Sequence, residues 1–149
     1  MTALTVLSHA ALGVMVPRGR GFLLNVSSVA SFQSSPGLGV YAATKAYVTS
    51  LTEALHTEVR GSGVHVTALC PGLTLTEFQQ RSNTSGIELK VPDLAWTPVE
   101  QVARTGLRDV AANKTISVPG FVYKGAVTAS DLLPRAVARW FSGAVTRAD

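Results

Sequence analysis

Runs of hydrophobic residues alternate along the chain with short stretches rich in glycine, proline and serine. The first run, residues 2–16, is apolar for most of its length and predicts a buried helix that ends at Pro17. Residues 22–26 form a short apolar run preceded by glycine, which predicts a buried strand. The next stretch, 27–39, is rich in serine, glycine and proline and predicts a loop.

A second pair of elements follows this loop. Residues 41–60 are rich in helix-forming alanine, leucine and glutamate and predict a long helix that is closed by Gly61. Residues 64–70 are β-branched and apolar, end at Pro71, and predict a buried strand. A strand, a helix and a second strand in this order form a parallel unit with a right-handed crossover. The pattern therefore predicts an α/β fold.

The remainder of the chain repeats this alternation less regularly. Residues 73–95 are mainly polar and predict a long loop with a short helix at 76–81. Apolar residues recur at helical spacing over 98–113, with Thr97 as a candidate N-cap and Pro98 at the first helical position. A brief strand at 115–118 and a final helix over 131–143 complete the prediction.

Composition excludes several classes of protein. A chain of 149 residues with 46% hydrophobic residues can build one core, and its net charge of +4 comes from scattered basic residues, which is not the pattern of a nucleic-acid-binding protein. The apolar run at 2–16 is too short to cross a membrane. A single cysteine, Cys70, permits no intrachain disulfide and fits a reducing compartment such as the cytoplasm. The three histidines lack partners at ligand spacing, so no metal site is predicted.

Several candidate reactive residues fall at the ends of the predicted strands. Tyr41 and Lys45 are four residues apart and share one helix face, where an ammonium group favours the phenolate form of a tyrosine. Ser28 follows the first strand and Pro71-Gly72 follows the second, so both should lie at the edge of the sheet where open α/β folds bind ligands. Ser27 competes with Ser28 for the hydroxyl role because it is adjacent and of the same type.

These motifs together resemble the second half of the short-chain dehydrogenases/reductases. The resemblance implies that Ser28 polarises a substrate carbonyl, that Tyr41 transfers a proton to or from the substrate oxygen, and that Lys45 binds the nicotinamide ribose. It also implies that Tyr41, Pro71, Gly72, Thr74 and Thr76 contact NAD or NADP. Thr74 stands where an aliphatic residue is usual. The resemblance is carried by Asn25-Val26-Ser27-Ser28, Tyr41-Ala42-Ala43-Thr44-Lys45 and Cys70-Pro71-Gly72 with Thr76.

The resemblance implies a partial Rossmann-like, doubly wound parallel sheet, in which residues 1–149 form the C-terminal part of one NAD(P)-binding domain. The glycine-rich turn that holds the cofactor pyrophosphate in complete members does not occur in this sequence. We therefore expect the N-terminal strands of the family fold to be missing. A sheet without them would expose an apolar edge, which predicts a homo-oligomer or association through that edge.

Three functions remain open at this point. The first is an NAD(P)-dependent oxidoreductase that interconverts a ketone and a secondary alcohol on a small molecule, which could be a steroid, an acyl chain, a sugar or a small alcohol. The second is a truncated, non-catalytic fragment that serves as an oligomerisation or interaction module. The third is peripheral membrane or lipid contact through residues 120–141, where apolar and basic residues alternate.

Overall fold

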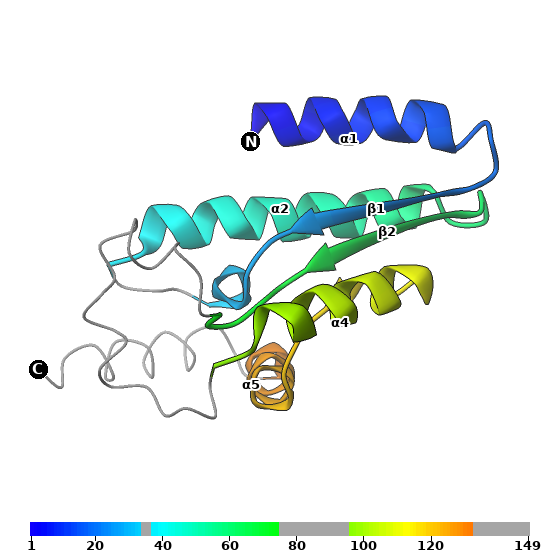
Figure 1. The fold of residues 1–149 in the computed structure, drawn as a ribbon. Helices are drawn as coiled ribbons and strands as arrows, with labels where there is room; N and C mark the ends of the chain where they lie inside the picture. The colour runs from blue at the N-terminus through cyan, green and yellow to red at the C-terminus, as the bar shows by residue number, and fades with distance from the viewer. Residues whose placement is uncertain (34–36, 75–95, 133–149) are drawn as a thin grey trace, which may run out of the picture.

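The computed structural model describes residues 1–33, 37–74 and 96–132 (Figure 1). Its centre is a parallel sheet in the order β1-β2-β3, which confirms the predicted α/β fold. Helices lie on both faces of this sheet (Figure 1). The strands are β1 (Gly21–Val26), β2 (Val64–Leu69) and β3 (Ile116–Ser117), and the helices are α1 (Thr2–Met15), α2 (Gly39–Glu58), α4 (Val99–Ala111) and α5 (Phe121–Leu132).

The crossover from β1 to β2 through α2 sets the register of the sheet. Gly21 pairs with Val64 and Val26 pairs with Leu69, so the two strands begin and end together. The turn before β2 contains Gly63 at φ +78°, a backbone conformation that L side chains rarely adopt. A side chain there would also collide with the carbonyl oxygen of Gly19, in the turn that precedes β1. The glycines beside the strands therefore fix where both strands start.

Two hydrophobic clusters cover one face of the sheet. The first joins α1 and α2 to β1 and β2 through Leu12, Val59, Val64 and Val66, with Met15, Leu23 and Leu55 packed around them. The second joins β2 and β3 to α5 through Ala68, Cys70, Val118 and Val127. A hydrogen bond of 2.5 Å between Thr5 Oγ1 and the Tyr47 hydroxyl also ties α1 to α2. Helix α4 lies on the opposite face, where Gly106 contacts Leu24 and Leu69.

Several predicted boundaries need correction. The N-cap of α4 is Pro98, not Thr97, because the ψ angle of Pro98 is 142° and the helix begins only at Val99. Thr97 is instead buried, and its amide donates to the Leu73 carbonyl at 2.9 Å. The predicted loop at 27–39 contains a short 3-10 helix, η1 (Val29–Phe32). The hydrophobic pattern did not predict α5.

Other sequence predictions lie wholly or mostly outside the described residues. These are the short helix at 76–81 and most of the helix at 131–143. None of the described helices is long and apolar enough to cross a membrane. In the region suggested for lipid contact, Val127 is buried in the second hydrophobic cluster, and Tyr123 packs against that cluster. Part of that segment therefore serves the protein core.

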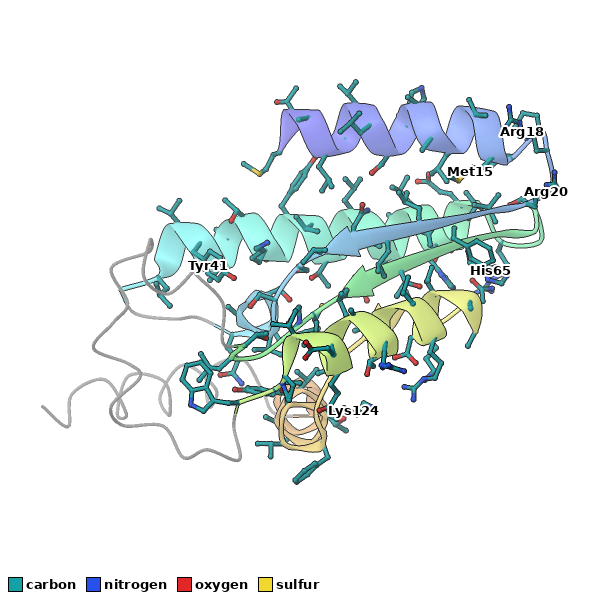
Figure 2. All side chains as sticks on the ribbon, viewed as in Figure 1. Met15, Arg18, Arg20, Tyr41, His65 and Lys124 are labelled. Carbon is teal, nitrogen blue, oxygen red and sulfur yellow. The ribbon has the colours of Figure 1, made fainter. Side chains whose placement is uncertain are left out.

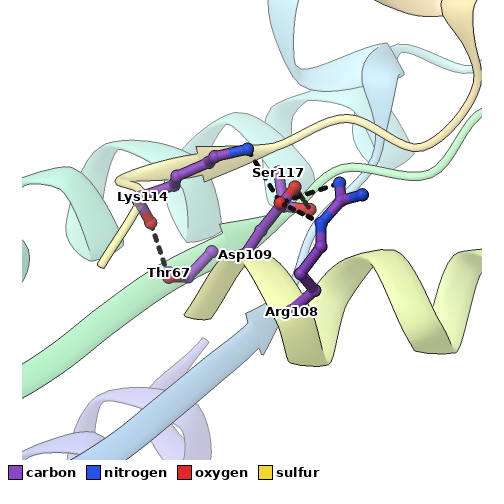
Figure 3. Close-up of polar contacts among 5 residues, drawn as sticks. All are labelled: Thr67, Arg108, Asp109, Lys114 and Ser117. Carbon is purple, nitrogen blue, oxygen red and sulfur yellow. Dashed lines mark hydrogen bonds and ion pairs between the residues drawn. The ribbon is translucent and has the colours of Figure 1, made fainter. Parts of the chain in front are cut away.

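One buried carboxylate joins α4 to β3 (Figure 3). Asp109 is 1% exposed, and its Oδ1 accepts hydrogen bonds from Arg108 and Lys114, at 2.8 Å in the case of Lys114. Its Oδ2 accepts from Ser117 Oγ at 2.8 Å. Burial by itself would raise the pKa of Asp109, but the hydrogen bonds from Lys114, Ser117 and Arg108 outweigh it and lower the pKa below its ordinary value.

The Asp109 contacts predict a pH-dependent contribution to stability. Asp109→Asn should lower the free energy of unfolding at neutral pH by about 2 kcal/mol, because the amide cannot replace a carboxylate that accepts from three side chains. The pKa of Asp109 in the folded protein lies below its ordinary value of 3.8. The extra unfolding free energy of the wild type is therefore fully present above pH 3.8, and it is lost as the pH falls through the pKa of Asp109 in the folded protein. Urea unfolding across this pH range measures both effects.

The matched control is Glu100→Gln, which changes an exposed carboxylate on the same helix. We expect it to leave the unfolding free energy within about 0.5 kcal/mol of wild type. A gap between wild type and Asp109→Asn that stays constant from pH 7 into the acid range would contradict the assigned role of Asp109.

Candidate active site

The carboxyl ends of β1 and β2 form the base of the candidate site. The Ser27 amide donates to the Leu69 carbonyl at 2.7 Å and the Val29 amide donates to the Pro71 carbonyl at 3.0 Å. These bonds continue the pairing of the two strands beyond their last residues. The chain segments that carry the serines and the Pro71-Gly72 turn are therefore held side by side.

Ser28 lies at this junction and begins η1. Its Oγ accepts a hydrogen bond from the Ala30 amide at 3.2 Å, which caps the short helix, and lies 3.5 Å from the Pro71 carbonyl as a donor. The cap explains why the chain turns into a 3-10 helix directly after β1. It also fixes the hydroxyl of Ser28 at the strand ends.

Ser27 points into the protein instead. Its Oγ donates to the Lys45 carbonyl at 2.8 Å and lies 2.7 Å from Thr49 Oγ1, which is 3.9 Å from the Cys70 sulfur. Burial raises the pKa of the Cys70 thiol, an effect that hydrogen bonds with Thr49, Ser27 and Ser31 only partly offset. The Ser27 hydroxyl is thus engaged in holding α2 against the sheet.

Helix α2 supplies the other two predicted site residues. Figure 2 shows Tyr41 on the first turn of α2, at the side toward which the arrows of β1 and β2 point. Lys45 follows one turn later, and its Nζ lies 5.8 Å from the centre of the Tyr41 ring. The same Nζ donates to the Val26 carbonyl at 3.1 Å. Burial lowers the pKa of the Lys45 ammonium, and the charge interaction with Cys70 works against that shift.

The Pro71-Gly72 turn lies across from Ser28. Thr74 Oγ1 donates to the Gly72 carbonyl at 3.4 Å, which keeps Thr74 close to the turn. Thr76, the remaining residue implied by the family resemblance, lies outside the described residues. The structure thus gathers Ser28, Lys45 and Pro71 at one edge of the sheet, with Tyr41 beside Lys45 on α2.

Tyr123 also lies at this edge, although the sequence placed it only in the stretch suggested for lipid contact and not in the site. Its hydroxyl accepts a hydrogen bond from the Leu73 amide at 3.0 Å. A signal was available, because Tyr123 follows β3, and the carboxyl ends of parallel strands meet at one edge. Pro119-Gly120 after β3 repeats the Pro71-Gly72 arrangement after β2.

The inward contacts of Ser27 can be tested by substitution. Ser27→Ala should lower the free energy of unfolding by about 1 to 2 kcal/mol, because it removes the donor to the Lys45 carbonyl and the partner of Thr49. Chemical unfolding with a fluorescence readout measures this loss. Ser50→Ala, at an exposed position of α2, is the control and should change stability by less than about 0.5 kcal/mol. Equal stability of all three proteins would show that the Ser27 contacts do not hold α2.

Proteins similar to this chain are short-chain dehydrogenases and other oxidoreductases. A family model described as short chain dehydrogenase matches residues 1–86, which is more than half of the chain. An oxidoreductase of Myxococcus xanthus is 40% identical over 74 residues, covering 50% of this chain and 29% of the relative. Gluconate 5-dehydrogenase of Gluconobacter oxydans is 34% identical over 93 residues, covering 59% of this chain and 36% of the relative.

Solved structures extend the likeness to most of the chain. A short-chain dehydrogenase from Sphingobium yanoikuyae, solved in complex with NADPH, superposes with a TM-score of 0.73 at 30% identity, over 88% of this chain and 50% of that one. A 7beta-hydroxysteroid dehydrogenase superposes with a TM-score of 0.78 at 24% identity, over 96% of this chain and 55% of that one, and shows the fold alone. The chain thus spans about half the length of these solved structures, and it belongs to the short-chain dehydrogenase/reductase family of oxidoreductases.

Proposed function

We propose that residues 1–149 supply the catalytic part of an NAD(P)-dependent oxidoreductase that interconverts a ketone and a secondary alcohol on a small molecule. The observation that carries the proposal is the placement of Lys45, whose ammonium donates to the Val26 carbonyl and lies 5.8 Å from the centre of the Tyr41 ring. Lys45 thereby places a cation beside the Tyr41 ring at the strand ends. Tyr41 would then serve as the general acid and base.

Each site residue has a proposed part in this reaction. In the direction of reduction, bound NAD(P)H would supply the hydride to the carbonyl carbon, and the Tyr41 hydroxyl would give its proton to the carbonyl oxygen. Ser28 would hold that oxygen by turning its hydroxyl proton from the Pro71 carbonyl, 3.5 Å away, to the substrate. Ser27 is engaged at shorter distances, with the Lys45 carbonyl at 2.8 Å and Thr49 at 2.7 Å. Lys45 would also bind the nicotinamide ribose.

The residues proposed to bind NAD(P) support a cofactor site in part. Lys45 provides a cation at the strand ends, and Pro71, Gly72, Thr74 and Thr76 are the proposed contacts for the nicotinamide side. The ring of Tyr123 fills the space beside the α-carbon of Gly72, so the absence of a side chain there is explained without a cofactor. Support for NAD(P) comes from the family and from relatives solved with NADPH or NADP. Either NAD or NADP satisfies the proposal.

The proposed domain and compartment follow from the same reasoning. We infer that residues 1–149 form the C-terminal part of one nucleotide-binding domain, because the solved relatives are about twice as long. The buried single cysteine is compatible with a reducing compartment, which supports a cytoplasmic location.

The proposed chemistry is tested by nucleotide binding and turnover. NADH and NADPH are titrated by fluorescence into the chain alone and into a mixture with the N-terminal part of a full-length relative. Turnover is then followed with gluconate and hydroxysteroid substrates, chosen from the matched relatives. Tyr41→Phe should reduce turnover by about 100-fold or more, since it removes the transferable proton.

Tyr47→Phe is the matched control, because Tyr47 lies on the same helix and its hydroxyl is bonded to Thr5 on α1. It should retain most of the turnover. Nucleotide binding by neither the chain nor the mixture, or full turnover by Tyr41→Phe, would overturn the proposal.

A second candidate function is a non-catalytic interaction module that associates through β1. Within the described residues, β1 pairs only with β2, so its other edge has no strand beside it. Phe22 and Val26, on the same face of β1 as Leu24, are 60% and 56% exposed. Unpaired strand edges with exposed apolar residues favour pairing with another chain.

We infer that a second copy of the chain can occupy the open edge of β1. Lysine substitutions on β1 test this inference. Phe22→Lys combined with Val26→Lys should shift the sedimentation coefficient from that of an oligomer to that of a monomer, because edge charges oppose strand pairing. Val40→Lys, at an exposed apolar position on α2, is the control and should leave the oligomer intact. A wild-type chain that sediments as a monomer at every concentration would exclude the second-copy occupant.

A further inference from the structure

Tyr123 reaches from α5 to the turn that follows β2. Its hydroxyl accepts the Leu73 amide proton at an N···O distance of 3.0 Å. The carbonyl of the same residue, Leu73, accepts from the Thr97 amide at 2.9 Å. Both backbone groups of Leu73 are therefore bound by segments far away in the sequence, and the turn has little freedom to shift relative to α5.

The ring of Tyr123 also explains the glycine in this turn. A β-carbon added at Gly72 would lie 2.2 Å from two ring carbons of Tyr123, which is closer than real contacts allow. The ring is partly buried and packs against the cluster of Ala68, Cys70, Val118 and Val127. Gly72 and Tyr123 thus form a fitted pair, in which a side chain at Gly72 would force the tyrosine out of place.

The Pro71-Gly72 turn also fixes the loop that carries Ser28. The carbonyl of Pro71 accepts the Val29 amide at 3.0 Å and lies 3.5 Å from Ser28 Oγ. Only Gly72 separates Pro71 from Leu73, the residue that Tyr123 binds. A continuous path of hydrogen bonds and one peptide segment therefore runs from the Tyr123 hydroxyl to the Ser28 hydroxyl.

We infer that Tyr123 is a positioning residue, which holds the turn of Pro71, Gly72 and Leu73 so that Pro71 can orient Ser28. The inference rests on the proposed function insofar as it gives Ser28 a part in the reaction. Tyr123 acts through the backbone of the turn and makes no contact with the reacting atoms in this assignment. Helix α5 thereby becomes part of the site, although it follows Pro71 by 50 residues.

Amide hydrogen exchange on the 149-residue chain tests this inference without any turnover. Tyr123→Phe keeps the ring over Gly72 and removes only the hydroxyl. We expect the amides of Leu73 and Val29 to exchange about fivefold faster in this variant, since one net hydrogen bond is lost. Amides in the centre of β1 and β2 should exchange at wild-type rates. Gly72→Ala should speed the same two amides, because its methyl group displaces the ring.

The control is Tyr47→Phe, which removes a tyrosine hydroxyl bonded to Thr5 and should leave both amides unchanged. In a form of the protein that turns over, Tyr123→Phe should lower kcat about tenfold, and that loss should vanish in a Ser28→Ala background, as expected for residues that act as one unit. A loss of equal size in both backgrounds would show a merely structural role and would overturn the inference.

The two proposals fail in distinguishable ways. If the Val29 amide exchanges at the wild-type rate in Tyr123→Phe, then Tyr123 does not position the Ser28 loop, whatever the activity. If Leu73 and Val29 both respond while Ser28→Ala retains full turnover, positioning of the loop stands and the proposed role of Ser28 is wrong.

Discussion

The alignment of the ends of β1 and β2 is the constraint on which the site depends. The Ser27 amide donates to Leu69 and the Val29 amide donates to Pro71, so the ladder between the strands continues into the loops. Without it, the serine hydroxyl and the Pro71-Gly72 turn would belong to two loops free to move apart. Because the strands are parallel, the same alignment brings the N-terminal turn of the crossover helix α2 to this edge.

Two neighbouring serines make different contacts at this edge. The Ser27 hydroxyl points inward to Lys45 and Thr49, and so anchors the helix that carries Tyr41. The Ser28 hydroxyl caps η1 and faces the Pro71 carbonyl. The alternation of side chains along an extended backbone gives this difference, since successive residues point to opposite faces.

Much of the fold could be predicted from the hydrophobic pattern, because the apolar runs at 22–26 and 64–70 correspond to β1 and β2, flanked by glycine and proline turns. Strand β2 is buried as predicted, but β1 is only partly buried, since Phe22 and Val26 are exposed. The grouping of Ser28, Lys45 and Pro71 could be anticipated from the rule for parallel strand ends. The position of α5 could not, because its residues show no clear helical pattern and are ordered by contacts of Tyr123 and Val127 with distant strands. The resemblance to the family already favours Ser28 over Ser27 by its spacing to Tyr41, whereas the contacts of each hydroxyl depend on the packing of α2 and could not be predicted.

The burial of Cys70 has a consequence for how the protein can be observed. Its thiol is fully enclosed beneath the site, lies 3.9 Å from Thr49 Oγ1, and has a pKa raised by burial. Thiolates, rather than protonated thiols, are the species that react with alkylating reagents. The sole sulfhydryl group of the chain can therefore be modified only when the elements packed over it, which include α2 and α5, separate from the sheet. The rate at which Cys70 is alkylated therefore reports how often the candidate site opens.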